Sequence, residues 1–162
     1  MLFFNADDGS GEKVWKSDGT PEGTMMVKDI DPYEDSFCWD LAEVNGTVFF
    51  GANDGIHGWE LWKSDGTPEG TQLVKDIKPG EWTSLPQALA NINGTLFFSA
   101  VGEMGGQELW KSDGTAEGTV LVKDIHKKGD SGPYRITDVN GIAFFIANDE
   151  FHGGELWTSN GT

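Results

Sequence analysis

Aromatic side chains that stand beside carboxylates and amides form the first candidate site in this chain of 162 residues. Trp39, Trp59, Trp82 and Tyr134 lie in segments rich in Asp, Glu, Pro and Gly, which are typical of loops. Flat rings of this kind can stack on the apolar face of a sugar. Because binding residues usually lie on loops held by a rigid framework, we predict that these four residues bind a ligand, either a carbohydrate or a peptide. The alternative is that the rings pack beneath their own loops or at a contact between subunits.

Paired acidic residues raise the question of a calcium site. Asp7, Asp54 and Asp149 each have an acidic or amide neighbour, and carboxylate oxygens are the ligands that calcium prefers. The spacing matches neither an EF-hand nor a calcium-binding nonapeptide repeat. We therefore expect these residues to form turns and expect no cofactor or metal, with calcium as the alternative.

The sequence gives little support for catalysis. His57, His126 and His152 show no metal-ligand spacing, and no Gly-x-Ser-x-Gly motif is present. We predict that the chain is not an enzyme. A glycan hydrolase or lyase is the less favoured alternative, because paired carboxylates for such chemistry can come from distant parts of a chain. The lone Cys38 can form neither an internal disulfide nor a zinc site built from cysteines.

The charge balance excludes two classes of partner. The chain has 27 Asp and Glu against 11 Lys and Arg, which gives a formal net charge of −16. This charge repels phosphate backbones and anionic lipid, so we expect no nucleic acid partner and no membrane insertion. The opening residues lack the basic and apolar regions of a signal peptide.

A repeat of 47 or 48 residues decides the architecture. The phrase Trp-Lys-Ser-Asp-Gly-Thr begins at Trp15, Trp62 and Trp110 and returns as Trp-Thr-Ser-Asn-Gly-Thr at Trp157. Val-Lys-Asp-Ile and Asn-Gly keep the same spacing. Glycine-containing turns interrupt each period too often for helices, and the runs between them, such as 95–100 and 107–111, are strand-sized. Each full period therefore predicts four strands, and the chain predicts fourteen.

The repeated residues have structural interpretations. Trp15, Trp62, Trp110 and Trp157 are predicted to wedge between adjacent repeats, with sugar stacking as the alternative. The turn after each tryptophan is predicted to be formed by the acidic or amide residue of the phrase, namely Asp18, Asp65, Asp113 and Asn160. The lysine of each Val-Lys-Asp-Ile motif is expected to protect the outer edge of its sheet.

These features predict an all-β fold, a β-propeller built of four-stranded antiparallel blades of about 47 residues. The apolar Phe-Phe strands require burial on both faces, as when sheets stack face to face. We divide the single propeller segment, residues 1–162, into a partial blade at 1–30, blades at 31–77 and 78–125, and a partial blade at 126–162. About three and a half blades would leave open faces, so we expect as partner either another copy of the chain, closing a ring as a homo-oligomer, or flanking blades of a longer chain.

Glu60 to Thr67, Glu108 to Thr115 and Glu155 to Thr162 share nearly one sequence, and this sequence resembles the ELWxxDGT repeat family, also called hyalin-like. The first copy departs from it at Lys13, and the last at Asn160. The resemblance implies a propeller-like array on secreted or surface-attached bacterial proteins, and hence an extracellular or cell-surface location. The function expected is non-catalytic adhesion or ligand binding, with a glycan as candidate ligand. Assembly into a closed ring is the alternative.

Overall fold

The computed structural model describes residues 1–33, 36, 38–103 and 105–162, and within them every regular element is a β-strand. The strands form four small antiparallel sheets. Sheet 1 contains β1 (Leu2–Asp7), β2 (Glu12–Ser17) and β3 (Met25–Lys28). Sheet 2 contains β4 (Trp39–Val44), β5 (Thr47–Asn53), β6 (Trp59–Ser64) and β7 (Gln72–Lys75). Sheet 3 contains β8 (Gln87–Ile92), β9 (Thr95–Val101), β10 (Gln107–Ser112) and β11 (Val120–Lys123). Sheet 4 contains β12 (Tyr134–Val139), β13 (Ile142–Asn148) and β14 (Gly154–Ser159).

The prediction of fourteen strands is confirmed, and each sheet takes its strands from one repeat. The tight turns explain why the strands pair with their neighbours in sequence. Asn93 and Gly94 both have positive φ, 49° and 82°, as a two-residue type I′ turn between β8 and β9 requires. The Asn-Gly pairs at Asn45 and Asn140 have the same conformation.

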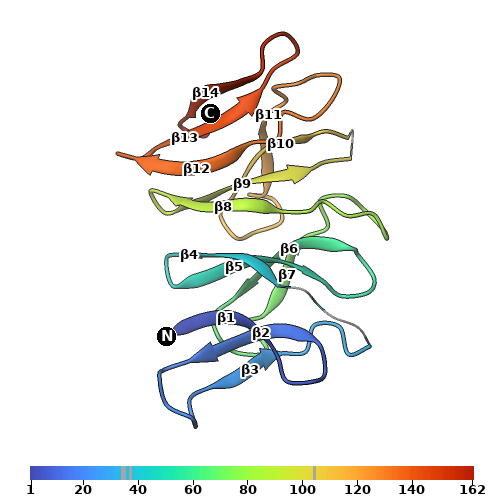
Figure 1. Ribbon diagram of the computed structural model, residues 1–162, viewed down its shortest axis with the longest axis vertical. Helices are drawn as coiled ribbons and strands as arrows, with labels where there is room; N and C mark the ends of the chain where they lie inside the picture. Colours follow the sequence, from blue (N-terminus) through green and yellow to red (C-terminus); the bar gives the residue numbers. More distant parts are fainter. Residues whose placement is uncertain (34–35, 37, 104) are drawn as a thin grey trace.

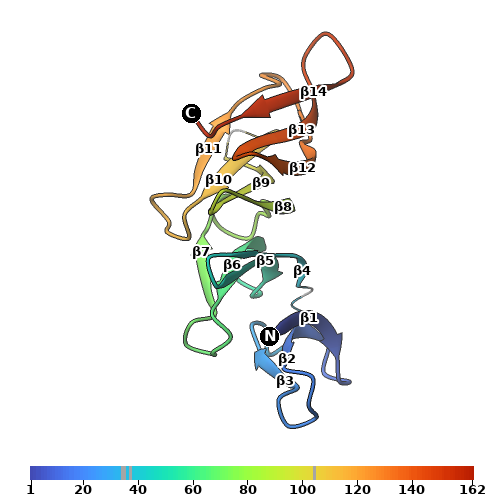
Figure 2. The ribbon, with the colours of Figure 1, turned by 90° about the vertical axis from the view of Figure 1, so that its left-hand side faces the viewer.

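The four sheets are stacked along the long axis of the molecule, from sheet 1 at the N-terminal end to sheet 4 at the C-terminal end (Figure 1). Seen from the side, the stack is open, and its two end sheets do not meet (Figure 2). Sheets 2, 3 and 4 contact one another through their first strands. Strand β8 of sheet 3 lies against β4 of sheet 2 and against β12 of sheet 4. The all-β architecture is therefore established, and within the described residues each of the two end sheets has one face that no other sheet covers.

Three apolar clusters join the sheets in pairs. Sheet 1 and sheet 2 share the cluster that contains Val14 and Trp62, and equivalent clusters join sheets 2 and 3 and sheets 3 and 4. Strands β5 and β9 are buried at every position except their ends. On β6 the two faces take different residues, since Trp62 faces sheet 1 and Leu61 faces sheet 3.

Lysines also connect the sheets. Lys16 and Lys63 each donate a hydrogen bond to a glycine carbonyl in the next sheet's turn, at 2.7 and 2.8 Å. Lys28 and Lys75 donate to the carbonyls of Thr71 and Thr119, both at 2.8 Å. Edge protection is thus not the whole role of the Val-Lys-Asp-Ile lysines, because their ammonium groups hold the backbone of the following sheet.

The end sheets expose residues that are buried in the middle of the stack. Leu156 on β14 is 70% exposed, whereas the corresponding Leu61 and Leu109 are 0% and 1% exposed. At the other end, Leu2 on β1 is 63% exposed and Met26 on β3 is exposed as well. The described residues include no helix with the length and hydropathy needed to cross a bilayer.

Candidate functional site

Two of the predicted loop tryptophans lie against each other where β4 and β6 begin. The ring centroids of Trp39 and Trp59 are 5.5 Å apart, with an interplanar angle of 25°. The indole N–H of Trp39 donates to the carbonyl of Pro86 at 3.0 Å. Gly51 on β5 makes room for this ring, since a Cβ there would lie 2.8 Å from Trp39 Nε1. The half-buried pair is therefore fixed by the framework beneath it.

The third tryptophan, Trp82, lies on the loop between β7 and β8, and the backbone of this loop is hydrogen-bonded to Trp59. The carbonyl of Trp59 accepts hydrogen bonds from the amides of Ser84 and Leu85, at 3.0 and 3.2 Å. Trp82, two residues earlier than Ser84, is 69% exposed, and Lys78 Nζ lies 5.7 Å from its ring centroid. A hollow of about 500 Å³ lies beside the ring and is lined by Lys78, Pro79, Trp82 and Glu103. An exposed indole face is thus carried on an anchored loop.

Tyr134 is not part of this group. It begins β12 in sheet 4, whereas the stacked pair lies in sheet 2 (Figure 1). Its ring is 47% exposed, and the guanidinium carbon of Arg135 lies 5.9 Å from the ring centroid. The structure brings together Trp39, Trp59 and the Trp82 loop but leaves Tyr134 two sheets away.

The loop before Trp59 is held by a carboxylate and a histidine. Asp54 accepts hydrogen bonds from the amides of Ile56 and His57, and its other oxygen lies 2.7 Å from His57 Nδ1. Burial acts to raise the pKa of Asp54, but these hydrogen bonds together hold it below its usual value. The hydrogen bond to Asp54 raises the pKa of His57. The pair therefore fixes the loop.

The same arrangement recurs in sheet 4. Asp149 accepts from the amides of Phe151 and His152 and lies 3.0 Å from His152 Nδ1. The hydrogen bond with the His152 side chain, followed by those two amides, lowers the pKa of Asp149 to about 2. Asp54 and Asp149 thus form turns, as predicted for the acidic loop residues. Among the described residues, no group of three or more metal-ligating side chains is close enough to hold an ion.

The four repeated tryptophans occupy equivalent positions on β2, β6, β10 and β14. Trp62 is buried in the cluster between sheets 1 and 2, and Trp110 and Trp157 pack against the next two clusters. Trp15 lies on the outer face of sheet 1 and is half-buried. These rings therefore pack against the preceding sheet wherever the described structure has one.

The repeated turn residues accept hydrogen bonds from the threonine two residues later. Asp65 Oδ1 accepts from the amide and the hydroxyl of Thr67, at 2.8 and 2.7 Å. Asp18, Asp113 and Asn160 make the same pair of bonds. The hydroxyl of the threonine, followed by its amide, lowers the pKa of Asp65. Because Asn160 has no charge, the turn depends on the acceptor oxygen and not on ionisation.

Two buried glutamates were not singled out as functional residues by the sequence. Glu60 is 0% exposed and accepts hydrogen bonds from the amide of Ile77 and the hydroxyl of Ser84, at 2.8 and 2.7 Å. Glu108 accepts from Ile125 and Ser131 at the same distances. The signal was the glutamate that precedes Leu-Trp in three copies. Each glutamate ties the third strand of its sheet to the connection that leads to the next sheet.

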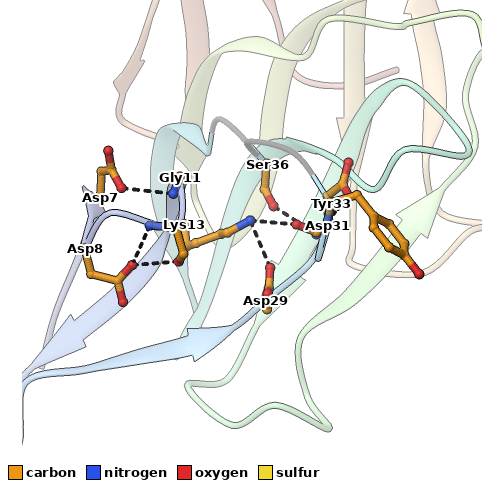
Figure 3. A network of polar contacts seen from close by, with 9 residues as sticks. Asp7, Asp8, Gly11, Lys13, Asp29, Asp31, Tyr33 and Ser36 are labelled. Carbon is orange, nitrogen blue, oxygen red and sulfur yellow. Dashed lines mark hydrogen bonds and ion pairs between the residues drawn. The ribbon is translucent and has the colours of Figure 1, made fainter.

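Lys13 replaces this glutamate in the first copy and reverses the pattern of donors. Its ammonium group, on a side chain 2% exposed, donates to the carbonyl of Asp31 at 2.6 Å and pairs with Asp29 at 2.9 Å (Figure 3). Ser36, which corresponds to Ser84, accepts from the amide of Asp31. The departure of the first copy from the repeat pattern is therefore matched by its partners.

Burial changes the proton affinity of two groups in the core. Burial raises the pKa of Glu60 to about 7, although hydrogen bonds from Ser84 and Ile77 act in the opposite direction. Burial also raises the pKa of Cys38 to about 12. The Cys38 thiol is therefore protonated at neutral pH and is buried in the cluster between sheets 1 and 2.

Comparison of the chain with family models, curated proteins and solved structures finds no match.

Proposed function

We propose that this chain is a non-catalytic repeat module of the β-propeller type that binds a glycan outside the cell. The observation that carries the proposal is the exposed indole ring of Trp82 on a loop whose backbone is bound to Trp59. A ring that is already held in place loses little conformational freedom when a sugar stacks on it. Lys78 and Glu103 border the hollow beside the ring and supply a donor and an acceptor for sugar hydroxyls.

The non-catalytic part of the proposal is supported by the positions of the buried carboxylates. Glu60 and Glu108 direct their oxygens at backbone amides within the stack. Side chains committed in this way are not available to a substrate at the loop surface. The extracellular location follows from the resemblance to the ELWxxDGT repeat family. The propeller arrangement is supported by the packing of β8 between β4 and β12, which is typical of sheets that radiate from a common axis.

A glycan array followed by titration tests the proposal. The wild-type chain is expected to bind at least one class of glycan, and Trp82→Ala is expected to weaken that binding roughly tenfold or more, as loss of a central aromatic contact does. Phe151→Ala is the matched control, because Phe151 is 82% exposed on a loop of sheet 4. Binding that is insensitive to Trp82→Ala, or no binding by the wild type, would contradict the proposal.

A second candidate function is assembly into a ring, and the two open end faces favour it. Val14 and Trp62 share the cluster between sheets 1 and 2. Leu156 stands in the position of Val14 on the outer face of sheet 4, and Trp15 stands in the position of Trp62 on the outer face of sheet 1. One copy can therefore present to the next the same pair of faces that pack together inside the chain.

A further inference from the structure

The outer edge of β14 differs from the corresponding edges in the other three sheets. Strands β2, β6 and β10 are the equivalents of β14 in the other sheets. Each of them pairs on its outer side with the short last strand of its sheet, namely β3, β7 and β11. Among the described residues β14 pairs only with β13. Its free edge leaves backbone donors and acceptors of a strand without a ladder partner, which is the usual template for the addition of another strand.

Glu155 on β14 differs in its hydrogen bonds from its counterparts in sheets 2 and 3. Its counterparts Glu60 and Glu108 each accept an amide hydrogen bond from an isoleucine and a hydroxyl hydrogen bond from a serine, at 2.8 and 2.7 Å. These donors belong to the segment that begins with β7 or β11. Glu155 Oε2 is buried and has no hydrogen-bond partner among the described residues. An acceptor in this state is costly unless a donor is supplied.

Lys123 in sheet 3 also differs from its counterparts in sheets 1 and 2. Lys28 and Lys75 each donate to the carbonyl of the threonine that precedes the last strand of the next sheet, at 2.8 Å. Lys123 is the next member of this series, and its ammonium group instead lies 5.9 Å from the ring centroid of Trp157. A groove of about 410 Å³ between β11 and β14 is lined by Val122, Lys123, Ile125, Trp157, Thr158 and Ser159, among others.

We propose that the β14 edge is an acceptor site for an extended peptide segment with the pattern Thr-x-x-Val-Lys-Asp-Ile followed after five residues by Ser. The segment pairs antiparallel with β14 and fills the groove. Its threonine carbonyl accepts from Lys123, and its isoleucine amide and serine hydroxyl donate to Glu155. In the pairing of β11 with β10, Leu121 lies opposite Trp110. In the same register, the second residue after the threonine of the segment lies opposite Trp157. This inference does not depend on the glycan proposal.

A synthetic peptide of residues 119–131 of this chain, Thr119 to Ser131, is the probe. It is expected to bind the wild-type chain at a ratio of one to one, measured by calorimetry, and to slow hydrogen exchange of the β14 amides. A peptide methylated on the amide nitrogen of Ile125 is expected to bind roughly tenfold more weakly or worse, because it lacks the N–H donor to Glu155. This change leaves the protein, and hence its folding, untouched.

A variant of the protein tests the same contact from the other side. Glu155→Ala is expected to weaken peptide binding, and Glu150→Ala, in the loop before β14, is the matched control. Equal affinity for a peptide of scrambled sequence, equal affinity for the methylated peptide, protection confined to other strands, or the absence of binding would each overturn the proposal.

Discussion

The carboxyl group of Glu60 makes the stability of the folded chain depend on pH. Its pKa is raised to about 7 in the folded chain from the ordinary value of 4.5, so the folded state binds this proton more tightly than the unfolded state does. The contribution of Glu60 to stability is therefore fully present below about pH 4.5 and is lost as the pH rises through about 7. Carboxylates with lowered pKa values, such as Asp65, act in the opposite sense.

Glu60→Gln is expected to remove the Glu60 contribution to this pH dependence. The difference in unfolding free energy between Glu60→Gln and the wild type should change with pH between about 4.5 and 7, by at most about 1.4 kcal/mol per pH unit. Urea unfolding at several pH values measures it. The exposed Glu117→Gln should follow the wild type, and a Glu60→Gln curve parallel to that of the wild type would refute the assignment.

The sequence indicated which residues repeat but not everything that these residues do. The glutamate before Leu-Trp is visible in three copies, yet its partners Ile77 and Ser84 lie 17 and 24 residues later. A contact over that distance depends on how the connection between two sheets folds, which local patterns do not contain. The four loop aromatic residues were predicted as a group, and only the structure separates Tyr134 from the three tryptophans.

The repeated turns that begin at Asp18, Asp65, Asp113 and Asn160 depend on an acceptor oxygen. Asp65→Ala removes the acceptor of two hydrogen bonds from Thr67 and is expected to lower Tm by a few degrees. Asp65→Asn keeps the acceptor, as Asn160 does in the last copy, and is expected to melt close to the wild type. Thermal melts followed by circular dichroism decide this, and equal losses in both variants would show that charge, and not the acceptor, holds the turn.

The strands and hairpins could be predicted because their causes are local. Asn-Gly tolerates positive φ, and apolar runs bounded by turns are the length of a strand. The irregularity in the first strand of three sheets had no such signal. Asp40, Ala88 and Arg135 have φ of 53°, 53° and 54° at register shifts in β4, β8 and β12. These residues share no side-chain type, so the bulge is imposed by packing of the sheets and not by the residue itself.

For the whole molecule, the open end faces predict association that depends on salt. A net charge of −16 on each copy opposes contact, and screening by salt weakens this repulsion. Raising the ionic strength is therefore expected to increase the mass of the chain in sedimentation experiments. Leu156→Lys, which places a charge on the exposed outer face of sheet 4, should prevent the increase. Phe151→Lys, on a loop away from that face, should not, and a mass independent of salt and of Leu156 would exclude head-to-tail packing.

The number of sheets could be predicted from the repeat, but the closure of a ring could not. Closure depends on small rotations between neighbouring sheets, and these rotations depend on how side chains such as Trp62 and Trp110 fill the space between them. Sequence identity between copies predicts similar interfaces without giving the angle. The structure shows an open stack, and a complete propeller remains a proposal.

The reversed polarity at Lys13 means that the first unit cannot be exchanged with its neighbours. Its ammonium group needs a carbonyl and a carboxylate, from Asp31 and Asp29, where Glu60 needs an amide and a hydroxyl. A designer who wishes to lengthen this protein should therefore duplicate the second or third unit. A duplicate of the first, grafted onto a connection that supplies N–H groups, would confront a buried cation with donors only.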